Sequence, residues 1–457
     1  MKIRFVTLGC KLNFAESSAI GKALLQQGHT RAKQGEEADI CVINTCSVTD
    51  NADHKDRQTI HRIHRQNPNA IIIVTGCYAQ LQPEQIAQIE GVDYVLGQNE
   101  KYEITQLVDD IERLRDSLED ASLQDAASGY SLEAQKIRVA NIREVEEFHG
   151  AYSKDDRTRC FLKVQDGCNY FCTYCTIPYA RGKSRNPRIS EVVANAQQAL
   201  AQGAKEIVLT GVNIGDFGRS TGESFIDLLK ALDRLGERAP HEVTNFVGDP
   251  AEAIRREARG MDYRIRISSC EPNLLTDEII DFVAHSKHFA PHFHIPLQSG
   301  SNEVLSIMKR RYTRELFEER IKHIKQVMPH AFIGVDCMVG VRGETEECFN
   351  DYVKFIKRLD VSQLHVFTYS ERANTRMLEL DVCIVPKAER QRRSKILHEI
   401  SEEKTKTFYA NQAGRELVVL WESKKEGDQM AGFTENYVKV HRPYDKEKVN
   451  TFEVIRL

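Results

Sequence analysis

Three cysteines in the segment CNYFCTYC, Cys168, Cys172 and Cys175, are the residues with the clearest chemical potential. Thiolates at these spacings can bind three irons of a [4Fe-4S] cluster and leave the fourth iron open to bind and reduce a ligand. The alternative is a zinc site, which usually takes four ligands in two closely spaced pairs. His149 and Cys160 lie upstream, but neither completes a second pair. The spacing therefore favours a cluster with an open iron.

The first hundred residues alternate short apolar runs with helical patterns, which predicts βαβ units and a parallel sheet. The expected strands are Ile3–Thr7, Asp39–Ile43, Ile71–Thr75 and Tyr94–Leu96. Cys10, Cys46 and Cys77 each follow one of the first three runs. Because the carboxyl ends of parallel strands lie along one edge of a sheet, we expect these thiols to converge as a second metal site. The alternative for any single cysteine is a small buried hydrophobe, which is our interpretation of Cys41.

A second series of apolar runs and helical patterns follows an acidic connector. The runs are Cys160–Gln165, Glu206–Leu209, Arg264–Ser268, Phe293–Leu297, Phe332–Val339 and Leu364–Tyr369. The helical patterns cover about 190–203, 224–235, 276–286, 314–328 and 346–358. This alternation predicts a complete or partial β/α barrel, with Cys168 at the carboxyl edge of its first strand. Residues 237–261 show no clear pattern and resemble an insertion.

The last part of the chain changes character. A charged helix is expected over Ala388–Ala410, and the short runs Glu416–Trp421, Gly432–Val440 and Thr451–Ile455 predict a small all-β barrel. The fold class is therefore α/β with an additional β module. The predicted division is an α/β domain at 1–125, a linker at 126–155, a barrel core at 156–385, and the β module with its leading helix at 386–457.

Composition limits where the protein acts and what it binds. The 457 residues include twelve cysteines and no apolar run near the ~20 residues of a membrane span, so we expect a cytoplasmic protein with reduced thiols and no membrane contact. A net charge of −4 argues against general nucleic-acid affinity. However, residues 177–188 carry four bases and no acid, which is a local phosphate-binding pattern.

Both cysteine sets, in this order, resemble the radical S-adenosylmethionine (SAM) methylthiotransferases. The resemblance spans nearly the whole chain and rests on the motifs TLGCKLN, NTCSVT, TGCYAQ, DGCNYFCTYCTIPYARG, HIPLQSGS, YSERANT and GFTENYVKV. GCKLN, YCTIPYARG and LTGVNIGDFG look most like the branch that acts on threonylcarbamoyladenosine in tRNA. Sibling branches act on isopentenyladenosine in tRNA or on an aspartate of a ribosomal protein, and both remain alternatives.

The resemblance implies a fold and a reaction. The fold would be an N-terminal α/β domain, a radical SAM barrel and a C-terminal TRAM domain. The reaction would use SAM and two [4Fe-4S] clusters, one on Cys168, Cys172 and Cys175 and the other on Cys10, Cys46 and Cys77, to add a methylthio group to adenosine 37. No catalytic acid or base is expected. The implied partners are tRNA, an electron donor of the flavodoxin or ferredoxin type, and a sulfur source.

Further contacts follow from the loops beside the expected clusters. Residues expected to bind SAM are Tyr174, Thr210, Gly211, Asn213, Ser268, Glu271 and Gln298, although a loop-capping polar residue would look the same. Residues expected to bind RNA are Arg181, Lys183, Arg185 and Arg188, with His54, Arg57, His61 and Arg65 on one helical face. That face could equally be a solvated surface. A different class also remains open, a non-catalytic iron–sulfur protein that binds RNA or senses redox state.

Overall fold

The computed structural model describes residues 1–33, 35–120, 136–153, 158–235 and 262–457. Contacts divide the chain into two compact units, Met1–Glu147 with Cys175–Lys183, and Phe148–Tyr174 with Ser184–Leu457. By contacts, the segment that begins at Cys175, the last cysteine of the CNYFCTYC motif, belongs with the first unit, and the C-terminal sheet belongs with the barrel. The predicted domain boundaries stay a prediction. Residues 237–261 lie outside the described part. No described helix is long and apolar enough to cross a membrane.

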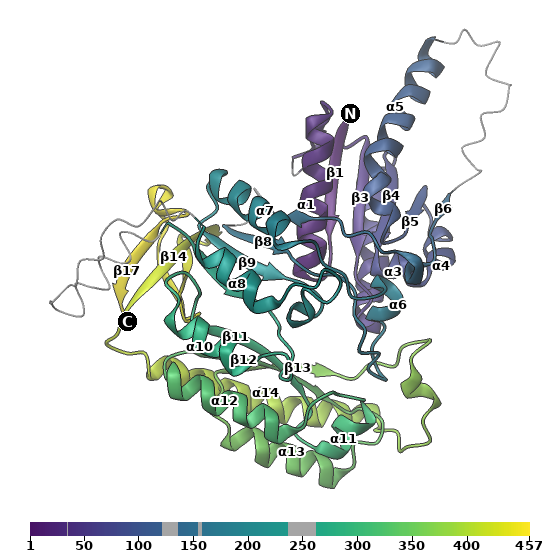
Figure 1. Cartoon of the computed structure of the whole chain (residues 1–457). Coiled ribbons are helices and arrows are strands. Elements are labelled where there is room, and N and C mark those ends of the chain that lie inside the picture. The colour runs from purple at the N-terminus through teal and green to yellow at the C-terminus, as the bar shows by residue number, and fades with distance from the viewer. Residues whose placement is uncertain (34, 121–135, 154–157, 236–261) are drawn as a thin grey trace. The chain divides into compact units, whose positions relative to one another are not determined.

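The first unit is built on a six-stranded sheet of parallel strands in the order β2-β1-β3-β4-β5-β6 (Figure 1). Its strands are β1 (Lys2–Thr7), β2 (Thr30–Arg31), β3 (Ile40–Thr45), β4 (Ile71–Gly76), β5 (Tyr94–Leu96) and β6 (Ile137–Arg138). Its helices are α1 (Lys11–Gln26), α2 (Asp50–Gln66), α3 (Cys77–Leu81), α4 (Pro83–Ala87), α5 (Ile104–Asp120) and α6 (Ile177–Arg181). The four predicted strands are confirmed. The two-residue edge strands were missed because they are too short to show a periodic pattern.

Both faces of this sheet are covered by helices. Apolar residues of α1 and α5 pack on one face, and those of α2, α3 and α4 pack on the other. Burial on both faces explains why the strands read as continuous apolar runs. Cys41 is fully buried in β3, as its interpretation as a core residue requires.

The second unit contains a partial barrel. Its strands form the groups β10-β9-β8-β7 and β11-β12-β13, and isolated bridges from Ile265 to Phe289 and from Ser269 to His294 join the two groups. The strands are β7 (Ala151–Tyr152), β8 (Arg159–Lys163), β9 (Glu206–Thr210), β10 (Arg264–Ile267), β11 (His292–Gln298), β12 (Phe332–Val339) and β13 (Gln363–Thr368). All pair in parallel except β7, which was not predicted.

Helices enclose the outer face of the barrel. They are α7 (Ile189–Ala201), α8 (Phe225–Asp233), α10 (Asp277–His285), α11 (Asn302–Ile307), α12 (Arg314–Val327), α13 (Glu346–Arg358) and α14 (Lys387–Ala410). Alternate strand residues such as Leu162, Ile207 and Val335 pack in the helix-facing core. The residues between them face the barrel interior, and many of these residues are polar. The barrel interior can therefore bind polar or charged groups.

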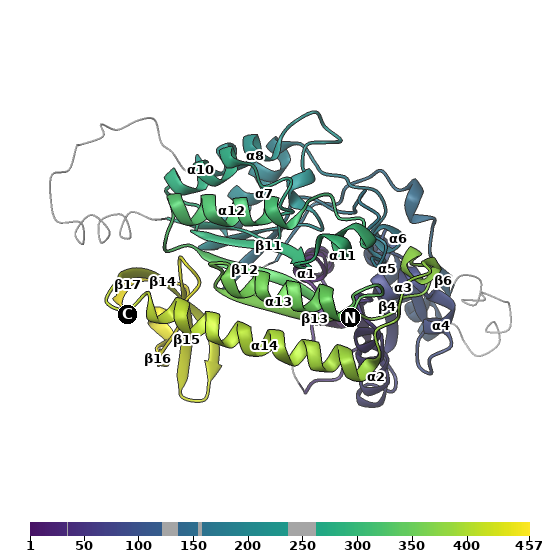
Figure 2. The same cartoon turned by 90° about the horizontal axis from the view of Figure 1, so that it is seen from below.

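An antiparallel sheet of order β16-β15-β14-β17 ends the chain. Its strands are β14 (Glu416–Glu426), β15 (Gln429–Thr434), β16 (Lys439–Pro443) and β17 (Phe452–Arg456). The prediction of one run over Gly432–Val440 was wrong, because a turn with Tyr437 at positive φ divides it into two strands. Figure 2 shows α14 running beside α13 toward this sheet.

The C-terminal sheet docks on the amino-terminal ends of the barrel strands. Arg264 donates hydrogen bonds to the carbonyls of Val418 and Phe433, and Arg266 donates to Thr434 and Glu435. Both guanidiniums also pair with the fully buried carboxylate of Glu206. This charged junction leaves the opposite, carboxyl-terminal edge of the strands for the site described next.

Candidate iron–sulfur sites

Three cysteines from separate loops of the first unit lie together. Cys10 precedes α1, Cys46 follows β3 and Cys77 begins α3, so each stands beyond the carboxyl end of a parallel strand. Burial raises the pKa of the Cys46 thiol, and the nearby Cys77 and Cys10 raise it further. The loops that carry the three cysteines therefore lie at one edge of the sheet, as expected from the strand ends. That the three thiols bind one metal cluster stays a prediction.

Glycines bring these loops into close contact. A Cβ on Gly9, where φ is +92°, would lie 2.8 Å from Cys46 Sγ. Gly76, also at positive φ, would place a Cβ against the backbone of Thr45. Asn13 then ties the loops together, because its amide donates to the carbonyls of Leu8 and Thr45 at 2.8 and 2.9 Å.

Two buried cations lie beside the three thiols. Glu16 is fully buried and pairs with Lys101 at 2.6 Å and with Arg181 at 3.1 Å. Arg181 also donates to Asn13 Oδ1 at 2.6 Å, and Gln98 donates to Cys77 Sγ at 3.2 Å. Burial raises the pKa of the Cys77 thiol, whereas Arg181 and Lys101 lower it. Arg181 and Lys101 thus place positive charge close to Cys77, which favours its thiolate form.

The CNYFCTYC motif follows β8 in the second unit. Burial raises the pKa of the Cys168 thiol to about 12, and the charge of nearby Cys172 acts in the same direction. The backbone N–H of Tyr170 donates to Cys168 Sγ at 3.4 Å. Cys175, the first residue of the segment that packs with the first unit, is half-buried. A positive charge must stabilise the thiolate form of partly buried cysteines such as Cys168, and bound iron would supply that charge.

Arg310 contacts the motif from the loop after α11. Its guanidinium donates to Cys172 Sγ at 3.2 Å and to the Tyr174 hydroxyl at 3.4 Å, and it pairs with Glu271. Hydrogen bonds to cluster sulfurs tune reduction potentials. Arg310 could not be recognised from the sequence, because only the fold brings it to the motif. Glu271, expected to bind SAM, uses one carboxylate oxygen to pair with Arg310.

Gln165 connects the motif loop to the loop after β9. Its amide donates to the carbonyls of Asp166 and Gly167 at 2.8 and 2.7 Å, and its carbonyl accepts from the N–H groups of Val212 and Asn213 at 2.9 and 2.8 Å. Gln165 is fully buried. The sequence analysis missed its role because an isolated glutamine in a strand-like run carries no pattern.

Several buried polar atoms near the strand ends fit a polar ligand. The side-chain amide of Asn213 lies near the Tyr170 hydroxyl, but neither its Oδ1 nor its Nδ2 makes a well-formed hydrogen bond to a described residue. The Tyr170 hydroxyl itself accepts from Asn273 Nδ2 at 2.9 Å. Asn273 Oδ1 and Gln298 Oε1 also lack a partner among the described residues. Burying such groups unsatisfied is costly, so a ligand with amine, carboxylate or hydroxyl groups fits this edge.

The other residues expected at the SAM site are placed as follows. Thr210 and Ser268 are buried, and the Thr210 hydroxyl donates to the Val208 carbonyl at 3.2 Å. Gly211 packs closely, since a Cβ there would lie 2.9 Å from Gln165 Oε1. Tyr174 is half-buried and held by Arg310.

The expected basic patch after the motif requires correction. Arg181 is 1% exposed and holds Glu16, and Arg185 is 8% exposed and holds Asp166 at 3.4 Å. These side chains therefore do not present charge to a phosphate backbone. Lys183 and Arg188 are exposed. The charge run was misread because sequence alone does not show which of its members are buried.

The basic face of α2 is placed at the surface. His54, His61 and Arg65 are exposed, while Arg57 is half-buried and donates to the Tyr78 hydroxyl at 2.8 Å.

Comparisons with known proteins cover the whole chain. Residues 2–97 match the family described as uncharacterized protein family UPF0004, and residues 162–356 match the radical SAM superfamily. The fold resembles that of a radical SAM methyltransferase, TsrM from Kitasatospora setae, with a TM-score of 0.53 and 16% identity over 80% of this chain and 72% of that one.

Curated relatives are similar over nearly their full lengths. The chain is 37% identical to the threonylcarbamoyladenosine tRNA methylthiotransferase MtaB of Bacillus subtilis over 96% of this chain and 89% of that protein. It is 34% identical to the Aquifex aeolicus protein of the same name over 98% of both chains. It is 30% identical to a tRNA-2-methylthio-N(6)-dimethylallyladenosine synthase of Pelotomaculum thermopropionicum, over 94% of this chain and 88% of that protein. With two separate cysteine groupings on one such chain, the protein belongs to the radical SAM methylthiotransferase family, in its MtaB-like branch.

Proposed function

We propose that this enzyme converts N6-threonylcarbamoyladenosine at position 37 of tRNA to its 2-methylthio derivative. The observation that carries this proposal is that the loops bearing Cys10, Cys46 and Cys77 lie at one sheet edge, in a chain that also has the CNYFCTYC motif. SAM cleavage alone needs only one three-thiolate site. A second such site could hold the cluster that supplies the inserted sulfur. The similarity to MtaB proteins supports the choice of substrate.

Each cysteine set would hold one [4Fe-4S] cluster. Cys168, Cys172 and Cys175 would hold the cluster that binds SAM, and Cys10, Cys46 and Cys77 would hold the auxiliary cluster. When bound, these groups supply one-electron cleavage of SAM and the methylthio group. The protein's own part is to exclude water by burying the thiols, and to balance charge through Arg181 and Lys101. No acid or base is needed for hydrogen abstraction, so a catalytic triad is not required.

The SAM site is proposed at the carboxyl edge of the barrel strands. Asn213 and Gln298, whose buried polar atoms lack partners among the described residues, are the best supported of the expected contacts. Asn273 joins them on the same ground. Tyr174, Thr210, Gly211, Ser268 and Glu271 line the same loops, and Gln165 and Arg310 would fix the loops' positions.

The remaining partners follow from the reaction. The exposed face of α2, with Lys183 and Arg188, is proposed to contact tRNA phosphates, which attract exposed basic side chains. The reaction also needs a low-potential electron donor of the flavodoxin or ferredoxin type and a sulfur source. A tRNA substrate supports a location in the cytoplasm.

Substrate choice can be tested by mass spectrometry of nucleosides after anaerobic reaction of the reconstituted protein with SAM, sulfide, a strong reductant and tRNA. The tRNA pool should contain both threonylcarbamoyladenosine and isopentenyladenosine. We expect the methylthio mass increase only on the first. An increase only on isopentenyladenosine would show that the proposed substrate is wrong and that the protein carries out the sibling reaction. That reaction is the main alternative, because the chain is 30% identical to a dimethylallyladenosine synthase. No product and no 5′-deoxyadenosine would favour a non-catalytic protein.

A further inference from the structure

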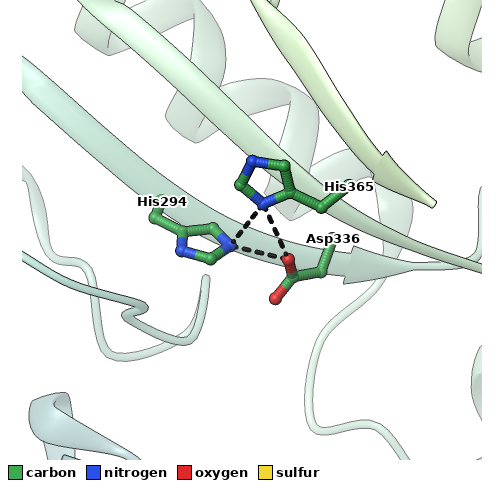
Figure 3. A group of neighbouring side chains, drawn as sticks. All are labelled: His294, Asp336 and His365. Carbon is green, nitrogen blue, oxygen red and sulfur yellow. Dashed lines mark hydrogen bonds and ion pairs between the residues drawn. The ribbon is translucent and has the colours of Figure 1, made fainter. Parts of the chain in front are cut away.

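A cluster of two histidines and one aspartate lies on the interior face of the barrel, in none of the roles assigned above. His294 is on β11, Asp336 on β12 and His365 on β13. Asp336 pairs directly with His365 in the strand register, and His294 pairs with Gly334, two residues before Asp336. A spacing of two keeps side chains on one face of a sheet. The three side chains therefore point the same way, as Figure 3 shows.

Three polar atoms meet at one point in this cluster. His294 Nε2 lies 2.6 Å from Asp336 Oδ1, His365 Nδ1 lies 3.3 Å from the same oxygen, and the two nitrogens are 3.2 Å apart. Around an ion with bonds of about 2.1 Å, neighbouring ligand atoms lie about 3.0 to 3.4 Å apart. The two separations from His365 Nδ1 lie in this range, and the one between His294 Nε2 and Asp336 Oδ1 is shorter, so a bound ion would move these two atoms slightly apart.

Hydrogen bonds can also hold this group together, because each imidazole nitrogen can carry one proton and a carboxylate oxygen can accept from two donors. The two nitrogens, 3.2 Å apart, then have no hydrogen bond between them. A cation between the three atoms would accept a lone pair from each of them and so use all three contacts.

The charge and exposure of the group also fit a cation. An Asp336 carboxylate and two neutral imidazoles would offer a cation one negative charge and a lone pair from each of the three side chains. The side chains of His294, Asp336 and His365 are 19%, 16% and 38% exposed. Three protein ligands on a partly open face leave coordination positions for water.

We propose that His294, Asp336 and His365 form a binding site for a divalent transition-metal ion inside the barrel, distinct from both cysteine sets. Two imidazoles and one carboxylate suit Fe²⁺, Mn²⁺, Co²⁺ or Zn²⁺ better than Mg²⁺ or Ca²⁺. The site lies four residues before Gln298 along β11, or about 13 Å deeper along the strand. It is therefore separate from Gln298, whereas Ser268, another proposed SAM contact, is next to Ser269, which bridges to His294.

A second group of possible ligands, His29, Asp109 and Glu112, provides a matched control. Its closest approaches are looser, at 3.7 Å from His29 to Asp109 and 4.0 Å from His29 to Glu112, and they use opposite nitrogens of the ring. The N-terminal amine of Met1 already lies 3.5 Å from Glu112. We therefore expect no metal ion there.

The test is cobalt retention by the full-length protein with its clusters reconstituted. The protein is equilibrated anaerobically with Co²⁺ and dialysed, and cobalt, iron and sulfide per chain are measured in each sample. Wild type and the control His29→Gln should retain about one cobalt per chain. Asp336→Asn and His365→Gln should bind it at least about ten-fold more weakly, with unchanged iron and sulfide.

A melting experiment guards against a folding artefact. Cobalt should raise the melting temperature of wild type and of His29→Gln, but not that of Asp336→Asn, because only a folded site gains from the ion. Equal cobalt in wild type and Asp336→Asn would overturn the proposal. Loss of cobalt from His29→Gln to the same extent would overturn it as well.

Discussion

At the scale of single residues, charge placement around the first cysteine site is the most informative feature. Arg181 and Lys101 enclose one buried carboxylate and lower the pKa of the Cys77 thiol, against the larger effect of burial. Three thiolates in a buried loop cluster repel one another, so nearby cations offset part of that cost. Arg181 therefore supports the cluster site, not the RNA surface.

We expect Arg181→Met to lower the iron content of the first site and to reduce the free energy of unfolding by about 3 kcal/mol, because Glu16 loses a buried partner. Iron and sulfide analysis with urea unfolding measures both effects. Arg65→Met, an exposed arginine of the same unit, is the control and should behave as wild type. If Arg181→Met retained wild-type iron and stability, the charge-balancing role would be wrong.

The cysteines were identifiable from the sequence, whereas their supporting residues were not. Cys168, Cys172 and Cys175 share a short spacing, and Cys10, Cys46 and Cys77 share a position after predicted strands. Gln165, Arg310 and Lys101 have no such pattern, because a buried polar residue is defined by partners far away in the chain. Arg181 and Arg185 were misplaced for the same reason.

At the scale of elements, loops after the parallel strands position the site through close backbone packing. Gly9 and Gly28 both adopt positive φ, at +92° and +97°, within the first unit. They differ in surroundings, because a Cβ on Gly9 would meet Cys46, whereas Gly28 has nothing within 4 Å. Substituting Gly28 should show the cost of backbone strain alone. Substituting Gly9 should show that cost together with the cost of crowding Cys46.

Gly9→Ala should reduce stability more than Gly28→Ala and should reduce iron at the first site, since both carry the backbone penalty of about 1 kcal/mol and only one disturbs a thiol. Thermal unfolding and iron analysis compare the two. Equal stability loss and equal iron content in the two variants would contradict the prediction. It would show that the loop around Gly9 can move to accommodate a methyl group.

Gln165→Leu should weaken SAM binding and reduce stability by about 2 to 4 kcal/mol, because the N–H groups of Val212 and Asn213 lose their buried acceptor. Calorimetric SAM titration of the reconstituted protein and urea unfolding provide the readouts. Gln326→Leu, on the exposed face of α12, is the matched control. Unchanged SAM affinity in Gln165→Leu would show that Gln165 does not position the SAM-binding loops.

Strands and helices of the two main sheets were predictable because each parallel strand is buried as a continuous apolar run between helical patterns. Prediction failed where this physical signal is absent. The edge strands β2, β6 and β7 have only two residues each. The division between β15 and β16 depends on a turn at Tyr437, which a run of β-forming residues concealed.

At the scale of the molecule, the second unit joins its barrel to the C-terminal sheet through buried charges. Although burial raises the pKa of Glu206, Arg264 and Arg266 lower it more strongly, so it lies below the ordinary value of 4.5. A carboxyl group with a depressed pKa stabilises the fold above its unfolded pKa, and that contribution is lost as pH falls through the folded pKa.

Glu206→Gln should therefore lower the free energy of unfolding by about 3 to 5 kcal/mol at pH 7, because two buried guanidiniums lose their counter-ion. The difference from wild type should be full above about pH 4.5 and should shrink at lower pH. Denaturant unfolding across pH 3 to 8 gives the comparison. A difference independent of pH would contradict the electrostatic explanation.

If the two cysteine sets perform two parts of one reaction, as we propose, mass spectrometry of a single anaerobic reaction mixture should separate the two parts. The assay measures 5′-deoxyadenosine and methylthio-threonylcarbamoyladenosine together, for wild type and two triple variants. Replacing Cys10, Cys46 and Cys77 with alanine should preserve 5′-deoxyadenosine and abolish the methylthio product. Replacing Cys168, Cys172 and Cys175 with alanine should abolish both. Methylthio product from either triple variant would contradict the account.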